Sequence, residues 1–133
     1  GMHFYAAQPN EEYQPNAEQV ATAQKWAALS GSTITFTKDL EQVATDADVI
    51  YGNTWHSMAT TNPEQRVVDF APYQVNMRVI EMAKPDVIYM HCLPGTRGED
   101  MVDEVIESKY CVFWDQGENR MHTEKAVLVL TTL

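Results

Sequence analysis

The sequence is poor in cysteine: its 133 residues include only Cys92 and Cys111. These two lie on separate apolar runs, and their spacing is not that of a metal site. A disulfide scaffold is therefore not expected, and neither a metal nor a cofactor is indicated. A reducing compartment, the cytoplasm, is the expected location.

Basic residues are also scarce. Nine Lys and Arg residues stand against nineteen Asp and Glu residues, which gives a formal net charge of −10. The sequence lacks the basic run or basic face that nucleic-acid-binding proteins carry, so a nucleic acid is not an expected partner. The same acidity opposes the unaided capture of a phosphorylated anion.

Long apolar runs, internal repeats and low-complexity tracts are missing as well. No stretch approaches the roughly 20 apolar residues that span a bilayer, and no signal peptide is recognisable, so no membrane partner is expected. Hydrophobic residues nevertheless make up 44% of the chain, which is enough for one core. The length suits about one domain.

What the sequence does contain is an alternation of strand-like and helix-like segments. Asn16 and Asp39 are suited to cap helices, and Gly31 is suited to end one. We predict strands at residues 3–7, 33–37, 48–51, 87–92 and 110–114, and helices at 17–30, 39–44, 63–70, 75–83, 100–107 and 120–133. Residues 126–130 alone could instead form a strand. This alternation predicts an α/β fold with a parallel sheet and helices on its faces.

Polar loops at residues 53–58, 92–98 and 116–120 each follow a predicted strand. In a parallel sheet such loops converge on one edge, where these folds place ligands. His91 and Cys92 are adjacent, so their side chains should point to opposite faces. Cys92 could be an inert core thiol or a functional group at the strand end. Ser57 lacks a nucleophile-elbow context, and His56 has no partner at metal-ligand spacing.

Four ordered motifs resemble segments of the ornithine carbamoyltransferases. Residues 91–94 (His-Cys-Leu-Pro) are similar to the family's most specific signature, and residues 53–58 to its Asp-x-Trp-x-Ser-Met-Gly loop. Residues 72–76 resemble the helix start after that loop, and residues 113–120 resemble the segment that ends in Glu-Asn-Arg.

The resemblance implies a three-layer Rossmann-like domain with a parallel sheet. Residues 1–133 would be the second, ornithine-binding domain, truncated so that its first strand–helix unit is missing. The family's other domain, with its Ser-Thr-Arg-Thr-Arg phosphate loop and His-Pro-x-Gln segment, would be absent. The implied activity is carbamoyl transfer from carbamoyl phosphate to the side-chain amine of ornithine, giving citrulline and phosphate. This chain alone is expected to be inactive.

The resemblance also implies roles for particular residues. Asn53, Ser57 and Met58 would bind ornithine. Cys92 would be the catalytic residue and would contact carbamoyl phosphate together with Leu93 and Arg120.

Asn53 departs from the family, which has aspartate at this position. A neutral amide interacts less strongly with an ammonium group than a carboxylate does. Weaker ornithine binding, or a preference for another amine such as putrescine, is therefore expected. Ala59 replaces a glycine of the same loop.

Two further interpretations stay open. The chain could be an amino-acid-binding module without chemistry, or a non-catalytic remnant that self-associates. The apolar run at residues 126–130 would lie on the C-terminal helix, which makes a homo-oligomer through that helix a third expectation.

Overall fold

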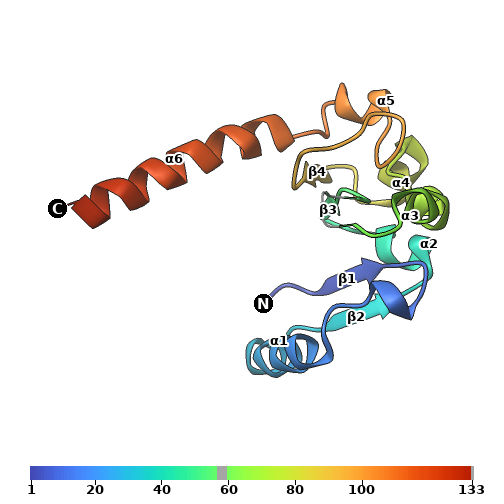
Figure 1. Ribbon diagram of the computed structural model, residues 1–133, viewed down its shortest axis with the longest axis horizontal. Helices are drawn as coiled ribbons and strands as arrows, with labels where there is room; N and C mark the ends of the chain where they lie inside the picture. The colour runs from blue at the N-terminus through green and yellow to red at the C-terminus, as the bar shows by residue number, and fades with distance from the viewer. Residues whose placement is uncertain (57–59, 133) are drawn as a thin grey trace.

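The computed structural model describes residues 1–56 and 60–132. Its elements follow in the order β1 (Phe4–Ala7), η1 (Glu11–Tyr13), α1 (Ala17–Ser30), β2 (Ile34–Thr37), α2 (Leu40–Ala44), β3 (Val49–Gly52), α3 (Pro63–Phe70), η2 (Ala71–Tyr73), α4 (Met77–Met82), β4 (Ile88–His91), α5 (Asp103–Ile106) and α6 (Phe113–Thr132) (Figure 1). Among the described residues, none of the helices combines the length and the apolarity that crossing a bilayer requires.

The helix ends follow the capping residues of the sequence. The Asn16 side chain accepts a hydrogen bond from the Glu18 N–H at 2.9 Å, and that of Asp39 accepts one from the Gln42 N–H at 3.0 Å. Gly31 ends α1 in the left-handed conformation, with φ of 71°. Both predicted N-caps and the predicted C-cap are therefore confirmed.

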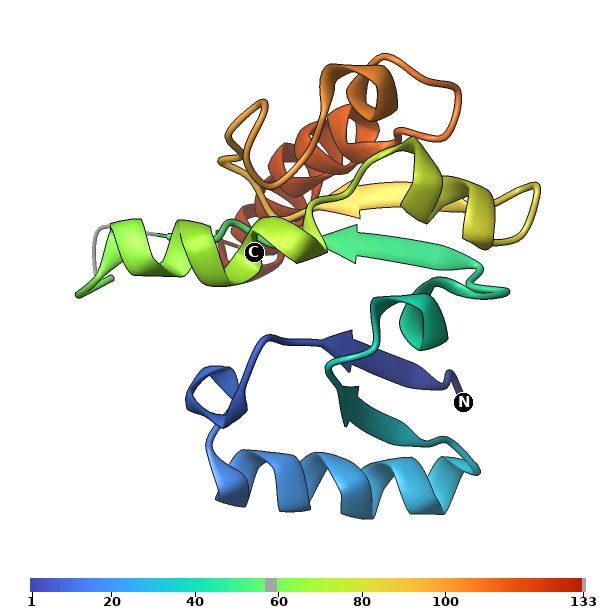
Figure 2. The ribbon, with the colours of Figure 1, turned by 90° about the vertical axis from the view of Figure 1, so that its right-hand side faces the viewer.

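The strands pair in parallel, as the sequence predicts. Phe4 lies opposite Ile34 at the start of the β1–β2 pair, and Val49 lies opposite Ile88 at the start of the β3–β4 pair. In the described part of the chain these pairs form two separate two-stranded sheets. Figure 2 shows all four strands running side by side in the same direction. The α/β fold with parallel strands is confirmed, but its sheet is interrupted between β1 and β3.

The core lies almost entirely in the half that contains β3 and β4. Tyr89 of β4 is completely buried, and Met101, Val105 and Phe113 pack around it. Burial raises the pKa of the Tyr89 phenol. By contrast, α1 has no buried residue. The half that contains β1 and β2 therefore contributes little to the core.

Contacts outside the sheets hold the two halves together. Helix α2 packs against both β1 and α4. At the carboxyl end of β1 and β2, the Tyr73 hydroxyl donates to the carbonyl oxygens of Gln8, at 3.3 Å, and Lys38, at 2.9 Å.

The predicted strand at residues 110–114 and the predicted loop at 116–120 are wrong. Cys111 makes only an isolated bridge to Tyr89, with hydrogen bonds from the Tyr89 N–H to the Tyr110 oxygen and from the Val112 N–H to the Tyr89 oxygen. Phe113 then turns into the core and starts α6, which continues to Thr132. Asp115 in the first turn favours this helix start, because a carboxylate stabilises the positive end of the helix dipole.

A candidate ligand site at the carboxyl ends of β3 and β4

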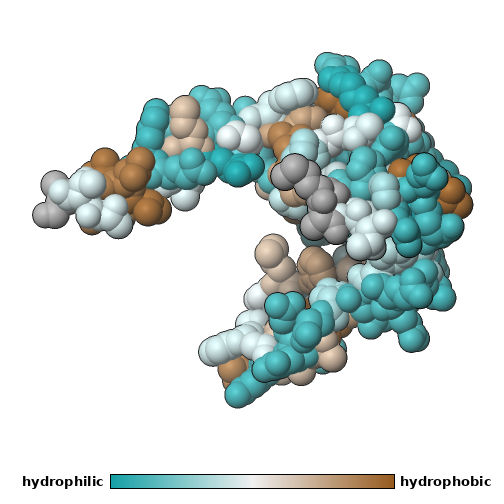
Figure 3. All heavy atoms as spheres, in the orientation of Figure 1, coloured by the Kyte–Doolittle hydropathy of each residue, from teal (hydrophilic) through white to brown (hydrophobic). Residues whose placement is uncertain are grey.

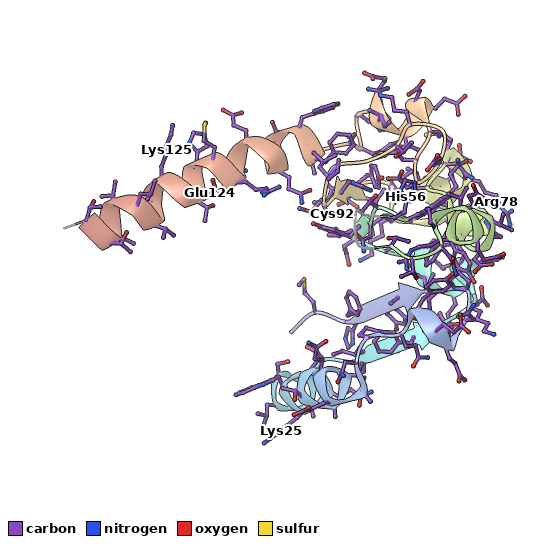
Figure 4. All side chains as sticks on the ribbon, viewed as in Figure 1. Lys25, His56, Arg78, Cys92, Glu124 and Lys125 are labelled. Carbon is purple, nitrogen blue, oxygen red and sulfur yellow. The ribbon has the colours of Figure 1, made fainter. Side chains whose placement is uncertain are left out.

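The loops that follow β3 and β4 meet at the carboxyl ends of these strands. The Cys92 thiol donates to Asn53 Oδ1 at 2.9 Å. Nearby, His56 Nε2 lies 3.1 Å from Glu99 Oε2, and both side chains are part-buried. The predicted convergence of these two loops is therefore confirmed. In Figure 4, Cys92 and His56 come from these neighbouring loops, while Glu124 and Lys125 lie on α6, which projects away from the body.

His91 and Cys92 point to opposite sides, as predicted. His91 is only 1% exposed, whereas Cys92 is half-buried. His91 Nδ1 accepts the Leu93 N–H at 3.0 Å, so the ring proton belongs on Nε2, which lies 2.8 Å from Asp100 Oδ2. A buried histidine at the end of β4 thus lies against the carboxylate of Asp100.

The loop at residues 92–98 is fixed from several sides. Leu93 has φ of 46°, a left-handed conformation that residues other than glycine seldom adopt. Its N–H is held by His91, and Asp100 Oδ1 accepts the Thr96 N–H at 2.8 Å. The Gln74 amide donates to the carbonyl oxygens of residues 98 and 99. The surrounding contacts therefore determine where Cys92 and Leu93 sit.

Residues 116–120, predicted as the third loop at the carboxyl ends of the strands, reach this edge as part of α6. Gln116, in the first turn of α6, accepts the His91 N–H at 3.1 Å and donates to the Tyr51 hydroxyl at 3.0 Å. Arg120 lies one turn further along α6 and is exposed. Gln116 is thus a site residue that the sequence reasoning missed, because no motif distinguishes a glutamine whose role depends on where a helix starts.

A pocket of about 440 Å³ opens beside the loop that follows β3. It is lined by Asn53, Thr54, Trp55, His56, Thr60, Thr61 and Arg66. The Arg66 guanidinium carbon lies 4.8 Å from the centre of the Tyr13 ring and 5.0 Å from that of Phe70. These cation–π contacts hold a positive group at the pocket. Ser57 and Met58, two of the predicted ornithine ligands, lie outside the described residues.

A hydrogen bond also lies behind Arg66, at the Tyr13 ring that this side chain covers. The Tyr13 hydroxyl donates to Asp69 Oδ2 at 2.6 Å. This bond lowers the pKa of the Asp69 carboxyl and raises that of the Tyr13 phenol. The ionised form of Asp69 is therefore favoured. Burial raises the pKa of the Cys111 thiol, so this thiol is a poor nucleophile. The Cys92 thiol, by contrast, contacts Asn53 in the loop after β3.

Parallel strands with helices around them, and polar groups gathered at the carboxyl ends of two adjacent strands, define a Rossmann-like ligand-binding domain. Residues 1–131 match the family model described as the Asp/Orn binding domain of aspartate/ornithine carbamoyltransferase. The chain therefore belongs to the aspartate/ornithine carbamoyltransferase family.

Several relatives are similar over nearly the whole chain. The ornithine carbamoyltransferase of Thermotoga petrophila is 43% identical over 135 residues, which cover 100% of this chain and 43% of that protein. The solved structure of ornithine carbamoyltransferase from Pyrococcus furiosus superimposes with a TM-score of 0.84 at 37% identity, covering 97% of this chain and 49% of that one. The anabolic enzyme of Campylobacter jejuni gives a TM-score of 0.86 at 30% identity, covering 96% and 42%. The chain thus spans less than half the length of these relatives.

Proposed function

We propose that this chain binds L-ornithine at the carboxyl ends of β3 and β4, as the ornithine-binding half of an ornithine carbamoyltransferase. The observation that carries the proposal is the 2.9 Å hydrogen bond from the Cys92 thiol to Asn53 Oδ1. The two residues are 39 positions apart and belong to two different motifs that resemble the family's. Their contact supports a single site built from both loops.

In this proposal, Asn53, Ser57 and Met58 hold ornithine. The Asn53 side-chain oxygen has two lone pairs, so it can accept one hydrogen bond from the Cys92 thiol and another from the ligand's amine at the same time. Being neutral, it adds no charge to that second bond, so the family's aspartate should bind the amine more tightly.

The proposed reaction joins the side-chain nitrogen of ornithine to the carbamoyl carbon of carbamoyl phosphate. The bond from that carbon to the phosphate oxygen breaks, phosphate leaves and the nitrogen loses a proton. Cys92, as the catalytic residue, and Leu93 would lie against the reacting groups, and Arg120 would contact carbamoyl phosphate. Stabilising a leaving phosphate requires several fixed donors or cations. Arg120, exposed on α6 in a chain of net charge −10, does not supply them alone, so transfer is expected only together with a carbamoyl-phosphate domain.

Calorimetric titration of the chain with L-ornithine, with and without carbamoyl phosphate, tests the proposal. We expect saturable heat that is lost in Ser57→Ala and Asn53→Ala. The control Ser32→Ala alters a half-buried serine between α1 and β2, whose hydroxyl lies 2.9 Å from that of Ser30, and should bind as the unmodified chain does. A flat trace under both conditions would overturn the proposal and leave the self-associating remnant as the better interpretation.

The neutral side chain of Asn53 supports a second candidate, a site for a different amine. Putrescine has the amines but no carboxylate, so it distinguishes the two. Tighter binding of putrescine than of L-ornithine would favour this second candidate, in which the chain is part of a related carbamoyltransferase that acts on putrescine. Ornithine binding that never leads to citrulline, even after a relative's carbamoyl-phosphate domain is added, would identify an amino-acid-binding module.

A further inference from the structure

His56 and Glu99 connect the loop after β3 with the loop after β4, and neither residue has a role in the proposed function above. His56 Nε2 lies 3.1 Å from Glu99 Oε2 across 43 positions of the sequence. Both side chains are 36% exposed, so solvent and ligands can reach them. The pair is therefore a contact between the two loops that form the proposed ornithine site, with polar atoms left over.

The hydrogen bond to Glu99 determines which nitrogen of His56 carries a proton. A carboxylate only accepts hydrogen bonds, so Nε2 has to be the donor. In the neutral ring Nδ1 then keeps a lone pair, because the bond made by one ring nitrogen sets the state of the other. Among the described residues, no hydrogen bond engages Nδ1. His56 thus offers one acceptor, with a carboxylate behind the ring.

This acceptor belongs to the same pocket as Asn53. Both residues line the cavity of about 440 Å³ beside the loop after β3. An ammonium group has three N–H donors and a full positive charge. The Asn53 oxygen can accept one of these N–H groups and supplies no charge. An ammonium group taken from water into this pocket therefore needs a further acceptor and a negative charge nearby.

Glu99 is the better placed of the two carboxylates in the loop after β4. Asp100 is 3% exposed, its Oδ1 accepts the Thr96 N–H, and its Oδ2 lies against His91. Its charge is therefore directed into the core. Glu99 is partly exposed and contacts a residue of the pocket wall.

We propose that His56 and Glu99 form the subsite for the ammonium group at the end of the ligand's side chain. The ammonium donates one hydrogen bond to Asn53 Oδ1 and another to His56 Nδ1, while Glu99 orients the ring and supplies the negative charge. The inference rests on the proposed function, because it adds residues to the same site. It makes the His56–Glu99 pair a determinant of specificity: a ligand without a side-chain amine should gain nothing from the pair.

Calorimetry with matched ligands separates this role from a structural one. L-norvaline lacks the side-chain amine of L-ornithine, and its affinity is measured by displacement of ornithine. Glu99→Gln removes the charge, and we expect ornithine to bind about tenfold more weakly and norvaline as before. In His56→Gln the amide nitrogen can still reach Glu99, but no acceptor stands in place of Nδ1. The same loss, for ornithine only, is expected.

Glu104→Gln is the matched control for the change of charge. Glu104 is exposed in the first turn of α5, and this variant should bind both ligands as the unmodified chain does. An equal weakening of ornithine and norvaline in Glu99→Gln or in His56→Gln would overturn the proposal, because the pair would then only hold the two loops together.

Nitrogen-15 NMR of the His56 ring gives a second test, which begins without ligand. At mildly alkaline pH we expect the proton on Nε2 and none on Nδ1, and a shift of the Nδ1 resonance when ornithine or putrescine is added, but not with norvaline. A proton on Nδ1 in the free chain, or an Nδ1 resonance that neither amine moves, would overturn the proposal.

The putrescine titration keeps this inference distinguishable from the proposed function. If putrescine binds, loses about tenfold in Glu99→Gln and ornithine does not bind, the ammonium subsite stands and ornithine binding fails. If ornithine binds equally to the unmodified chain and to Glu99→Gln, the subsite fails and ornithine binding stands. A chain that binds neither amine would overturn both.

Discussion

The Asn53 side-chain oxygen accepts a hydrogen bond from the Cys92 thiol. In the proposed complex the amine of the ligand lies against the same oxygen. In Asn53→Asp a carboxylate would face the ammonium group instead of an amide. Charge-assisted hydrogen bonds are stronger by about 1 kcal/mol or more, so we expect L-ornithine to bind about tenfold more tightly. Calorimetry measures this directly. L-norvaline, which lacks the side-chain amine, is the control ligand, and an equal gain for norvaline would contradict the amine contact.

Asp100 is the second residue with a measurable effect, this time on stability. It is 3% exposed, it accepts the Thr96 N–H, and it faces His91 Nε2. Asp100→Ala removes the acceptor of the Thr96 N–H and the carboxylate that lies 2.8 Å from the buried His91 Nε2, so we expect the free energy of unfolding to fall by about 1–3 kcal/mol in urea titrations. Asp103→Ala is the control: Asp103 is 69% exposed and pairs with Arg97, so its loss should cost less than about 1 kcal/mol.

At this scale the sequence predicts some contacts and not others. Motifs located the loops of Asn53 and Cys92, because each follows an apolar strand directly. The pairing of His91 with Asp100 was not predicted, since it depends on the left-handed turn at Leu93 that brings residue 100 back under the strand. The roles of Asn53, Ser57, Met58, Cys92, Leu93 and Arg120 stay predictions.

At the scale of elements, a glycine-to-alanine substitution should change the stability of the chain in opposite directions in α6 and in β3. An added Cβ at Gly117, inside α6, would lie 3.9 Å from its nearest neighbour, a Leu93 methyl group. Gly117→Ala should therefore stabilise the chain by about 0.5–1 kcal/mol through helix propensity. At Gly52, which ends β3, a Cβ would lie 2.6 Å from His91 and 2.7 Å from Tyr89. Gly52→Ala should destabilise by about 1–3 kcal/mol.

Thermal unfolding followed by circular dichroism measures both variants under the same conditions. Equal shifts of the two midpoints in one direction would contradict the packing at the ends of β3 and β4.

Element types followed from the sequence where the pattern was local. Caps and periodicity placed α1 at residues 17–30, and Pro63 placed the start of α3, predicted at residues 63–70, as the structure has them. The aromatic, β-branched run at 110–114 indicated a strand, but only Cys111 bridges β4 and Phe113 leaves for the core. Whether residues 110–114 form a strand or lead into a helix depends on tertiary packing, and local strand propensity carries no information about that packing.

On the scale of the whole molecule, the end of α6 carries a run of exposed apolar side chains (Figure 3). Val127, Leu128, Val129 and Leu130 are 53–76% exposed on a helix that projects from the rest of the chain (Figures 1 and 3). We expect concentration-dependent self-association through this end. In Leu128→Gln/Leu130→Gln the dissociation constant measured by sedimentation velocity should rise at least about tenfold.

Glu124→Gln changes an exposed polar position of the same helix and is the matched control. Association that is unchanged in the leucine double variant, or lost equally in Glu124→Gln, would assign the interface to another surface.

The division of the sheet affects which part of the chain unfolds first. Because β1 and β2 share no ladder with β3 and β4 in the described residues, and because α1 buries no residue, we expect the first 37 residues to unfold locally more readily than the rest of the chain. Side-chain contacts of Tyr13 and Tyr73, together with the packing of α2 on β1, couple this part of the chain to the remainder. We therefore expect a protease to cleave the chain first around α1, which has no buried residue, while the loops around Asn53 and Cys92 keep their shape.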